Sequence, residues 1–259
     1  MRQIERIITG ILGAGLPPEP TEPPKALYRD LIAGVDAVPV LQLAIGRAWV
    51  LVRTAANAGL AFSPRWPAGV MPALSERLDG LMLRDVARLA LRRHDLAAAI
   101  GIAAINAHYN RPTLAGAADD GLSDDPSDAP SDAGPTVVIG RFPGLDDKLP
   151  GALVIERNPG PRDLPESATE RVLPTARRVL ITASTLGNHS LPRLLALAPR
   201  ARVSLIGPGT PLAACLFGHG IAVLAGFVLD RPEAAADAVA RGDGAGQLKA
   251  FGRRLTLTR

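Results

Sequence analysis

The chain has one cysteine, Cys215, and few aromatic residues, which make up 3% of its 259 residues. A single cysteine excludes an intramolecular disulfide. Its surroundings, residues 212–217, predict a packed helix in which the thiol is a small buried hydrophobe. Because 47% of the residues are hydrophobic, the sequence can still build a sizeable core, made mainly of Leu, Ile, Val and Ala.

Long apolar runs and basic clusters are also missing. No segment reaches the roughly 18 consecutive apolar residues of a membrane-spanning helix, and residues 1–13 contain Glu5 and Arg6 but no signal-peptide core. The net charge is +4, with Arg spread singly and no Lys/Arg block interleaved with aromatics, which argues against a nucleic-acid groove. The sequence therefore predicts a cytoplasmic protein that binds neither membrane nor nucleic acid.

No catalytic motif is decisive. The sequence lacks a GxSxG elbow, a Walker loop and a Ser-His-Asp order, so hydrolase and NTPase functions are poorly supported. It also lacks HxxxH and CxxC pairs, so any metal site has to be assembled from distant segments.

Residues 1–114 predict a small α+β domain, because strands are followed by helices. The hairpin signal is Gly46-Arg47, between two apolar alternating runs. Asp95 is the expected cap of the last helix. The expected helices lie at residues 4–12, 26–33, 82–90 and 95–107, and the strands at 40–45, 48–53 and 59–62, with a Pro-rich break at 17–24.

Residues 115–135 differ sharply from the rest. They contain six Asp and no basic residue, among Ala, Gly, Ser and Pro. Such a stretch buries too little apolar surface to offset its ordering entropy, so it predicts a solvated, flexible linker. An acidic metal-binding loop is the alternative, although the Asp residues lack the spacing of a calcium loop.

Residues 136–259 alternate between strand and helix patterns, which predicts a parallel, Rossmann-like sheet. The expected strands lie at residues 136–140, 152–156, 178–183, 202–206 and 221–225, the helices at 191–197, 211–217 and 232–240, and a final edge strand at 254–258.

Two strand–loop–helix junctions, residues 179–190 and 203–211, carry the strongest functional signal. Each apolar strand gives way to small, polar and glycine residues, and a helix start signal follows at Ser190 and at Thr210. Loops at the carboxyl ends of parallel strands line the binding crevice, and free N–H groups at helix starts attract anions. The sequence therefore places a binding site at this sheet edge. A tight turn without a binding role remains the alternative at Gly207–Thr210.

Glu156 ends the second strand of this sheet, where dinucleotide folds often place an acid that binds ribose. However, Gly140, Phe142 and their neighbours do not form GxGxxG, and Pro143 lacks an N–H where a phosphate cradle needs one. Glu156 is therefore either a ligand or general base in the crevice, or a carboxylate paired with Arg157 or Arg162.

His189 and Asn106 leave similar alternatives open. His189 could ligate a metal, shuttle protons or contact an anion, or it could be a loop histidine satisfied by the backbone. Asn106 and Asn110 lie at the end of an Ala-rich helix, where they either face a crevice between the domains or cap the helix end.

Several short strings in both halves resemble one family. They are GLA (59–61), AIGIAAINA (99–107), VIGRFP (138–143), VIERNP (154–159), DLP (163–165), LP (173–174), ITASTLGN (181–188) and LIGPGTP (205–211). Those of the second half resemble the heavy-metal chelation family, and those of the first half resemble its companion domain, which has an enolase N-terminal-like fold. His189-Ser190 departs from the pattern, in which a small residue and then Thr are expected.

The resemblance implies an enolase N-terminal-like α+β domain at residues 1–114 and a Rossmann-like domain at 136–259, joined by the linker at 115–135 and facing each other across a cleft. It implies a role in handling heavy metals or metal cofactors, with a link to anaerobic cobalamin synthesis. Carried over by position, the cleft residues are Asn106, Glu156, Thr182, Ser184, Asn188, Gly207 and Thr210. The same loops add Gly140, Phe142, Thr185 and Pro208.

Three functions remain open on this basis. The first is a metal-binding or metal-chelate-binding protein, with a corrinoid-related ligand as one form, in which Glu156, Asn106 and His189 supply oxygen and nitrogen donors to a divalent transition metal. The second is an enzyme acting on a nucleotide-like or tetrapyrrole-like ligand in the same cleft, and the third a regulatory protein with a vestigial cleft. A homodimer is also open, with the N-terminal helix as its contact.

Overall fold

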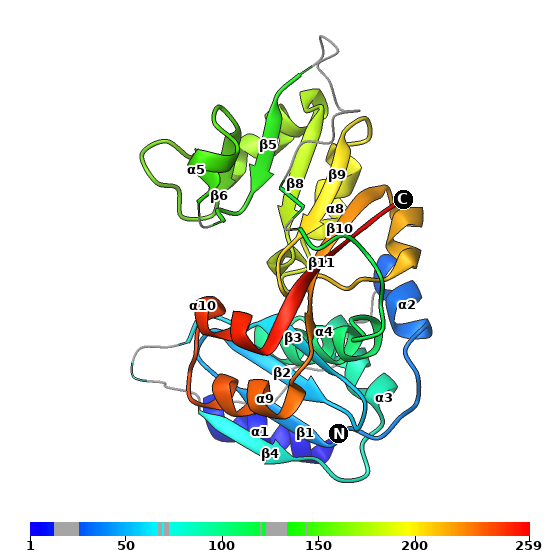
Figure 1. Ribbon diagram of the computed structural model, residues 1–259. Coiled ribbons are helices and arrows are strands. Elements are labelled where there is room, and N and C mark those ends of the chain that lie inside the picture. The colour runs from blue at the N-terminus through cyan, green and yellow to red at the C-terminus, as the bar shows by residue number, and fades with distance from the viewer. Residues whose placement is uncertain (13–25, 67–68, 70–72, 120, 123–133, 143) are drawn as a thin grey trace.

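The computed structural model describes residues 1–12, 26–66, 69, 73–119, 121–122, 134–142 and 144–259, which form two β-sheets, one above the other in Figure 1. One sheet is antiparallel and the other is mostly parallel, which confirms the predicted α/β class. The Pro-rich segment 17–24, Pro143 and most of the acidic stretch fall outside the described residues.

The first sheet has the strand order β3-β2-β1-β4. β1 (Gln42–Ile45) and β2 (Trp49–Arg53) form the predicted hairpin, although Gly46 N–H donates to Trp49 O, so the turn lies one residue later than expected. β3 (Ala58–Phe62) is the predicted third strand. β4 (Leu74–Arg77) is not predicted by the sequence, because this edge strand has a single apolar residue.

The N-terminal helices follow the predicted spacing: α1 (Arg2–Leu12), α2 (Ala26–Ala33), α3 (Leu83–Ala87) continuing into η1 (Arg88–Leu91), and α4 (Asp95–Tyr109). One cap differs from the prediction: the ring of His94 accepts the Ala97 N–H at 3.3 Å, so His94 caps α4 and Asp95 is its first residue. Small residues let α4 approach its neighbours closely, since a Cβ on Gly101 would lie 1.9 Å from Ala90 N.

The second sheet has the order β11-β10-β9-β8-β5-β6-β7, in which β11 alone runs antiparallel. All the predicted strands are confirmed within a few residues, and the two-residue β7 is added. The strands are β5 (Thr136–Ile139), β6 (Leu153–Glu156), β7 (Leu164–Pro165), β8 (Arg178–Thr182), β9 (Arg202–Ile206), β10 (Ile221–Leu229) and β11 (Gly252–Thr258). The order from β7 through β5 and β8 to β10 is that of the doubly wound dinucleotide-binding sheets.

Helical segments connect these strands: α5 (Leu145–Lys148), η3 (Glu166–Ala168), α6 (Thr169–Val172), η4 (Leu173–Thr175), α7 (Ser184–Gly187), α8 (Leu191–Leu197), η5 (Ala214–His219), α9 (Pro232–Ala240), α10 (Ala245–Leu248) and η6 (Lys249–Phe251). α8 and α9 have the predicted bounds.

The predicted helix at 211–217 is wrong. Leu212 N–H donates to the buried Asn110 side chain at 2.9 Å, residues 211–213 are not helical, and a 3₁₀ helix begins only at Ala214. Thr210 therefore caps no helix. Ser190 precedes α8 as predicted, but its side chain makes no capping hydrogen bond.

A helix of the second half of the chain, α9, covers one face of the first sheet. Along β2, Val50 and Val52 belong to the core that contains α4, whereas Trp49 and Leu51 belong to the core that contains α9. Because successive side chains of a strand point to opposite faces, α4 and α9 cover opposite faces of this sheet, as Figure 1 shows. The division into domains at residues 115–135 stays a prediction. In space, the two halves of the chain share a core.

Two asparagines near the end of α4 join the sheets. Asn106 Nδ2 donates to Leu60 O at 2.6 Å and to Gly209 O at 2.9 Å. Asn110 Nδ2 donates to Thr210 O and Phe227 O, and its Oδ1 accepts the Leu212 N–H. Both side chains are buried, so they satisfy backbone groups that water does not reach.

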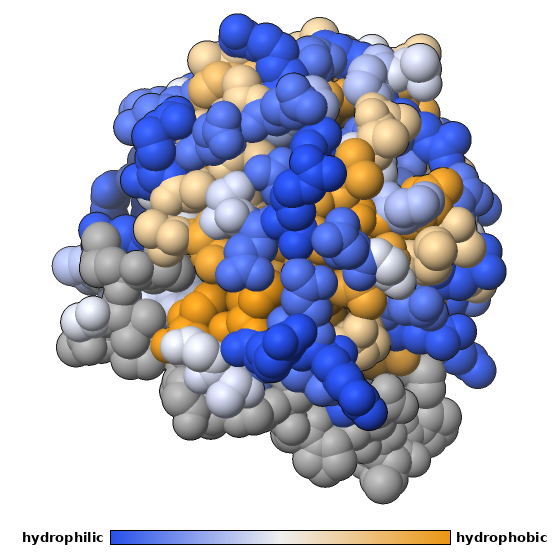
Figure 2. Space-filling model, turned by 90° about the horizontal axis from the view of Figure 1, so that it is seen from below, coloured by the Kyte–Doolittle hydropathy of each residue, from blue (hydrophilic) through white to orange (hydrophobic). Residues whose placement is uncertain are grey.

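Few large apolar side chains reach the surface. Those that are exposed in the described residues are Val38, Phe62, Met82 and Leu153. Seen from below, the surface is mainly hydrophilic around a central apolar area (Figure 2). Within the described ranges, no helix has the length and apolar character needed to cross a bilayer.

We expect Asn110→Ala to lower the free energy of unfolding by about 3 kcal/mol or more, because two carbonyls and one N–H lose their partner and each orphaned group costs about 1–3 kcal/mol. Urea unfolding of the purified variant measures this change. Asn188→Ala is the control: that side chain is exposed and bonds only within its own turn, so its loss costs about 1 kcal/mol or less. Equal losses in the two variants would contradict the role given to Asn110.

Candidate functional site

The second sheet changes direction between β5 and β8. From β5 the chain moves through β6 to β7 on one side, and from β8 through β9 to β10 on the other. The loops that leave the carboxyl ends of β5 and β8 therefore run in opposite directions. Ligands of open α/β sheets bind in the crevice at such a point. Gly140 and Thr182, two of the predicted site residues, lie at the ends of these two strands.

Gly140 has a structural requirement at this point. Its φ is +87°, and a Cβ on it would lie 2.5 Å from Thr182 Cγ2. Only glycine lets the two loops meet this closely. Thr182 and Ser184 are half-buried with their hydroxyl oxygens 3.4 Å apart, whereas Thr185 Oγ1 is committed to the Thr182 carbonyl at 2.7 Å.

The predicted site residues in the loop after β9 differ in burial. Gly207 and Pro208 are half-buried, and Gly207 N–H donates to Ala225 O. Thr210 is fully buried, as is Asn106, and both carry a buried oxygen that has no hydrogen-bond partner among the described residues. Gly207 and Pro208 therefore border the sheet edge, while Thr210 and Asn106 lie beneath it.

Glu156 binds the backbone. Its carboxylate accepts the N–H of Arg141 at 2.7 Å and the N–H of Arg157 at 3.0 Å. The Arg157 side chain instead lies 3.7 Å from Glu166, and Arg162 pairs with Asp146, so the expected side-chain pairing is absent. Glu156 thereby takes the loop N–H that a phosphate group would need.

An ionic network that sequence reasoning missed lies beside it. Arg141 donates to Asp163 at 2.5 Å and to Asp146 at 3.1 Å, and joins the loop after β5 to the loop after β6. The hydrogen bond from Arg141 holds the pKa of Asp163 below its usual value, and the two carboxylates raise the pKa of Arg141. The sequence feature that could have indicated this network is Arg141, the residue directly after the predicted site residue Gly140.

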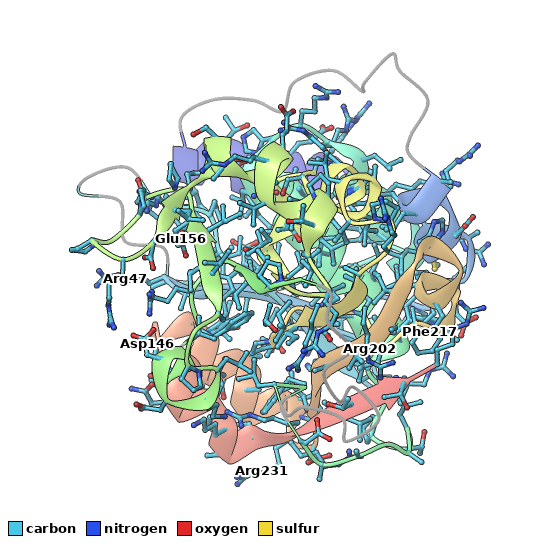
Figure 3. The ribbon with its side chains drawn as sticks, turned by 90° about the horizontal axis from the view of Figure 1, so that it is seen from above. Arg47, Asp146, Glu156, Arg202, Phe217 and Arg231 are labelled. Carbon is cyan, nitrogen blue, oxygen red and sulfur yellow. The ribbon has the colours of Figure 1, made fainter. Side chains whose placement is uncertain are left out.

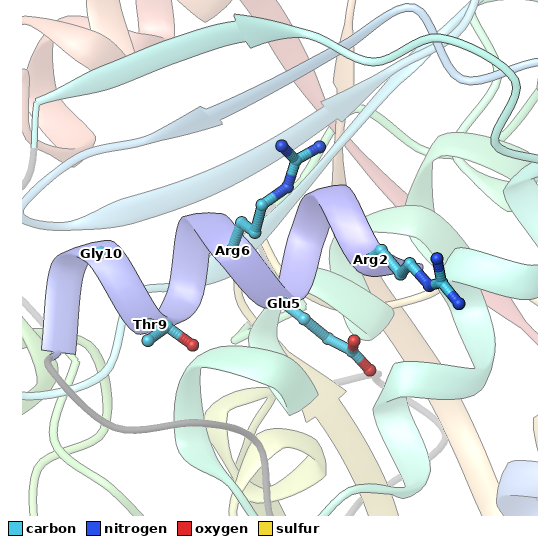
Figure 4. Close-up of a pocket in the computed structure, with 5 residues that line it drawn as sticks. All are labelled: Arg2, Glu5, Arg6, Thr9 and Gly10. Carbon is cyan, nitrogen blue, oxygen red and sulfur yellow. The ribbon is translucent and has the colours of Figure 1, made fainter.

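A depression in the surface adjoins this network. Arg141, Phe142, Gly144, Leu145, Asp146 and Asp147 line it. Phe142 is the predicted site residue among them. A second depression follows one exposed side of α1 (Figure 4) and contains none of the predicted site residues.

The His189 side chain packs against Tyr28 of α2 and the backbone that follows η1. Its φ is +60°, its Nε2 lies 3.1 Å from Arg92 O, and its ring centroid is 5.1 Å from that of Tyr28. Burial lowers its pKa. Neighbouring Asn188 is exposed and its Oδ1 accepts from Ser190. The second interpretation of His189, a loop histidine bonded to the backbone, describes this geometry.

The side chains of the described residues do not form a preformed metal site. Within the described part of the chain, no three His, Cys, Asp or Glu residues lie close enough to hold a metal ion. Glu156 and His189, the predicted metal ligands, are each engaged by backbone groups. Burial raises the pKa of Cys215, which does not favour the thiolate that metals prefer.

The buried His189 predicts a pH dependence of stability. The pKa of His189 is lowered in the folded chain, so below about pH 6.5 the unfolded chain binds a proton that the folded chain does not. The free energy of unfolding therefore decreases as the pH is lowered. His189→Asn keeps a residue that tolerates positive φ, and we expect it to flatten this fall. Burial also lowers the pKa of His108, so part of the loss of stability at low pH remains in the His189→Asn variant. Urea unfolding from about pH 7.5 to about pH 5 measures the slope, with Asn188→Ala as control; an unchanged slope in His189→Asn contradicts the assignment.

Two family models match the chain. DUF364, described as "Putative heavy-metal chelation", matches residues 127–258, and DUF4213, with the same description, matches residues 28–109. No protein of curated function matches significantly.

Two crystal structures of DUF364 proteins of unknown function are similar. That from Desulfitobacterium hafniense is 30% identical, with a TM-score of 0.75 over 90% of this chain and 97% of that one. That from Pyrococcus horikoshii is 17% identical, with a TM-score of 0.69 over 90% and 98%, and supports the fold alone. Since the DUF364 model alone covers more than half of the sequence, the chain belongs to the DUF364 family.

Proposed function

We propose that this protein binds a metal in the form of a chelate, at the carboxyl edge of its parallel sheet, and does not hold a bare ion with its own side chains. The observation that carries the proposal is the junction of β5 and β8. There Gly140 lies against Thr182, and the hydroxyls of Thr182 and Ser184 are half-buried at the sheet edge.

The side chains that could coordinate a metal are already hydrogen-bonded, which favours a chelate over a bare ion as the ligand. The carboxylate of Glu156 and the ring of His189 are already bonded, so a metal would have to bring its own ligands. The Thr182 hydroxyl accepts from Ser184 and can itself donate to the anionic oxygens of a chelator, and Ser184 can exchange its long, 3.4 Å hydrogen bond to Thr182 for one to the chelator. A corrinoid, whose ring nitrogens hold the metal, is one chelate of this kind that the family resemblance implies.

The antiparallel sheet would form the second wall. A Cβ on Gly209 would lie 3.6 Å from Ala61 Cα, so the end of β3 lies directly beside the loop after β9. We propose that the ligand cleft borders this buried contact, which forms its floor, between a Rossmann-like sheet and an enolase N-terminal-like sheet, in a cytoplasmic protein.

Cobalt in two forms tests the proposal. Cobalt(III) bis(iminodiacetate) is a substitution-inert, coordinatively saturated anion, so it binds only through its outer atoms, whereas Co²⁺ needs protein ligands. By calorimetry we expect the wild type to bind the complex and not Co²⁺. Thr182→Val and Ser184→Ala should each weaken binding about tenfold or more, because each loses a hydrogen bond to a charged group. Thr9→Val, on the exposed side of α1, is the control.

Stoichiometric binding of Co²⁺ without binding of the complex would overturn the proposal. So would binding of the complex that Thr182→Val and Ser184→Ala leave unchanged.

A second candidate is an enzyme or binding protein for a nucleotide-like ligand. The strand order and the place of Glu156 at the end of β6 favour it. Thermal-shift screening with nucleotides tests it: a shift that survives a metal chelator and is lost in Glu156→Gln supports this candidate over the first. The absence of any shift rejects it.

A further inference from the structure

Phe62 is an exposed aromatic ring on a rigid support. It is 53% exposed, and it is the one aromatic residue among the exposed large apolar side chains of the described chain. Its ring centroid lies 4.7 Å from that of Trp49, which is 1% exposed and packs in the core beneath α9. The ring is thus held from behind and open to solvent, an arrangement that costs little entropy when a ligand stacks on it.

Phe62 lies at the rim of the proposed site. It follows Ala61, whose Cα is the atom nearest to a Cβ built on Gly209. That same Cβ would lie 3.8 Å from Ala183 Cβ, between Thr182 and Ser184. The backbone of Phe62 is therefore one residue from the place where β3 meets the loops after β8 and β9, and its ring points to the side of the sheet that carries Trp49 and α9.

Two arginines without partners in the described chain lie on the chain segments next to Phe62. Ser63 joins the two segments, since its Oγ donates to Gly46 O at 2.8 Å and its N–H to Ala48 O at 3.0 Å. Arg47 is held between those two residues, and Arg65 follows two positions after Ser63. Both arginines are exposed, and within the described chain neither has an ion pair or a side-chain hydrogen bond.

Other arginines of the described chain are paired. Arg141 and Arg162 are neutralised by carboxylates, and Arg53 pairs with Glu233. Figure 3 shows Arg47 on the same flank of the molecule as Asp146 and Glu156. Within the described chain, the positive charge of Arg47 and Arg65 is therefore not neutralised by a carboxylate.

We infer that Phe62, Arg47 and Arg65 form a recognition wall that selects a ligand with a flat aromatic or conjugated ring carrying anionic groups. The ring would stack on Phe62, and the anionic groups would accept hydrogen bonds from the two guanidinium groups. This inference rests on the proposed function, because it names the chemical class that the same site takes.

A matched pair of probes tests the wall. Cobalt(III) bis(dipicolinate) and cobalt(III) bis(iminodiacetate) carry the same charge and the same kinds of donor atom, and differ in that dipicolinate has an aromatic ring. By calorimetry we expect the wild type to bind the dipicolinate complex at least tenfold more tightly. Phe62→Leu should abolish the preference and Phe62→Tyr should keep it.

The arginines should act on both probes equally, because both are anions. Arg47→Gln and Arg65→Gln should each weaken both complexes severalfold, and Arg6→Gln on α1 should not. In a Trp66→Phe background, Trp49 remains as the single tryptophan. Since it lies against Phe62, the dipicolinate complex should quench its fluorescence more than the iminodiacetate complex does.

The outcomes separate this inference from the proposed function. If both complexes bind equally and depend on Thr182, the proposed function stands and the recognition wall is overturned. A preference for dipicolinate that persists in Phe62→Leu also overturns the wall. If neither complex binds the wild type, both proposals fail.

Discussion

The amide groups of Asn106 and Asn110 are the constraint on which the rest of the arrangement depends. Asn106, in the last turn of α4, and Asn110, directly after α4, bond to backbone groups of β3, of the loop after β9 and of β10. Buried backbone groups need partners, so these bonds fix the path of residues 209–212 and hold that loop against the antiparallel sheet. The end of β3 is thereby placed at the carboxyl edge of the parallel sheet.

The chemistry of the site follows from which polar groups this architecture leaves available. Glu156 and His189, the groups most able to bind a metal, are used to hold loops and elements together. The hydroxyls of Thr182 and Ser184 and the side chains of Phe62, Arg47 and Arg65 remain. We propose that such a set recognises the outer atoms of a ligand and does not coordinate an ion. This proposal reconciles a family described by metal chelation with a chain that has no preformed cluster of metal ligands in its described residues.

Much of the fold could be predicted because the strands are apolar on both faces and the helices have clear spacing. α2, α8 and α9 have the expected bounds, and every expected strand is present. β4 escaped prediction because an edge strand needs little apolar surface. Residues 211–213 were misjudged because a distant side chain, Asn110, takes the Leu212 N–H that a helix would have used.

The sequence by itself determined the two sheets, the sheet edge at which Gly140, Thr182 and Gly207 gather, and the scarcity of metal-ligand spacing, since all of these follow from local periodicity and residue type. Only the tertiary structure decided that Glu156 and His189 are occupied by backbone groups, that α9 covers the first sheet, and that Phe62 is exposed against the buried ring of Trp49. These depend on contacts between residues far apart in the chain, which no local pattern encodes.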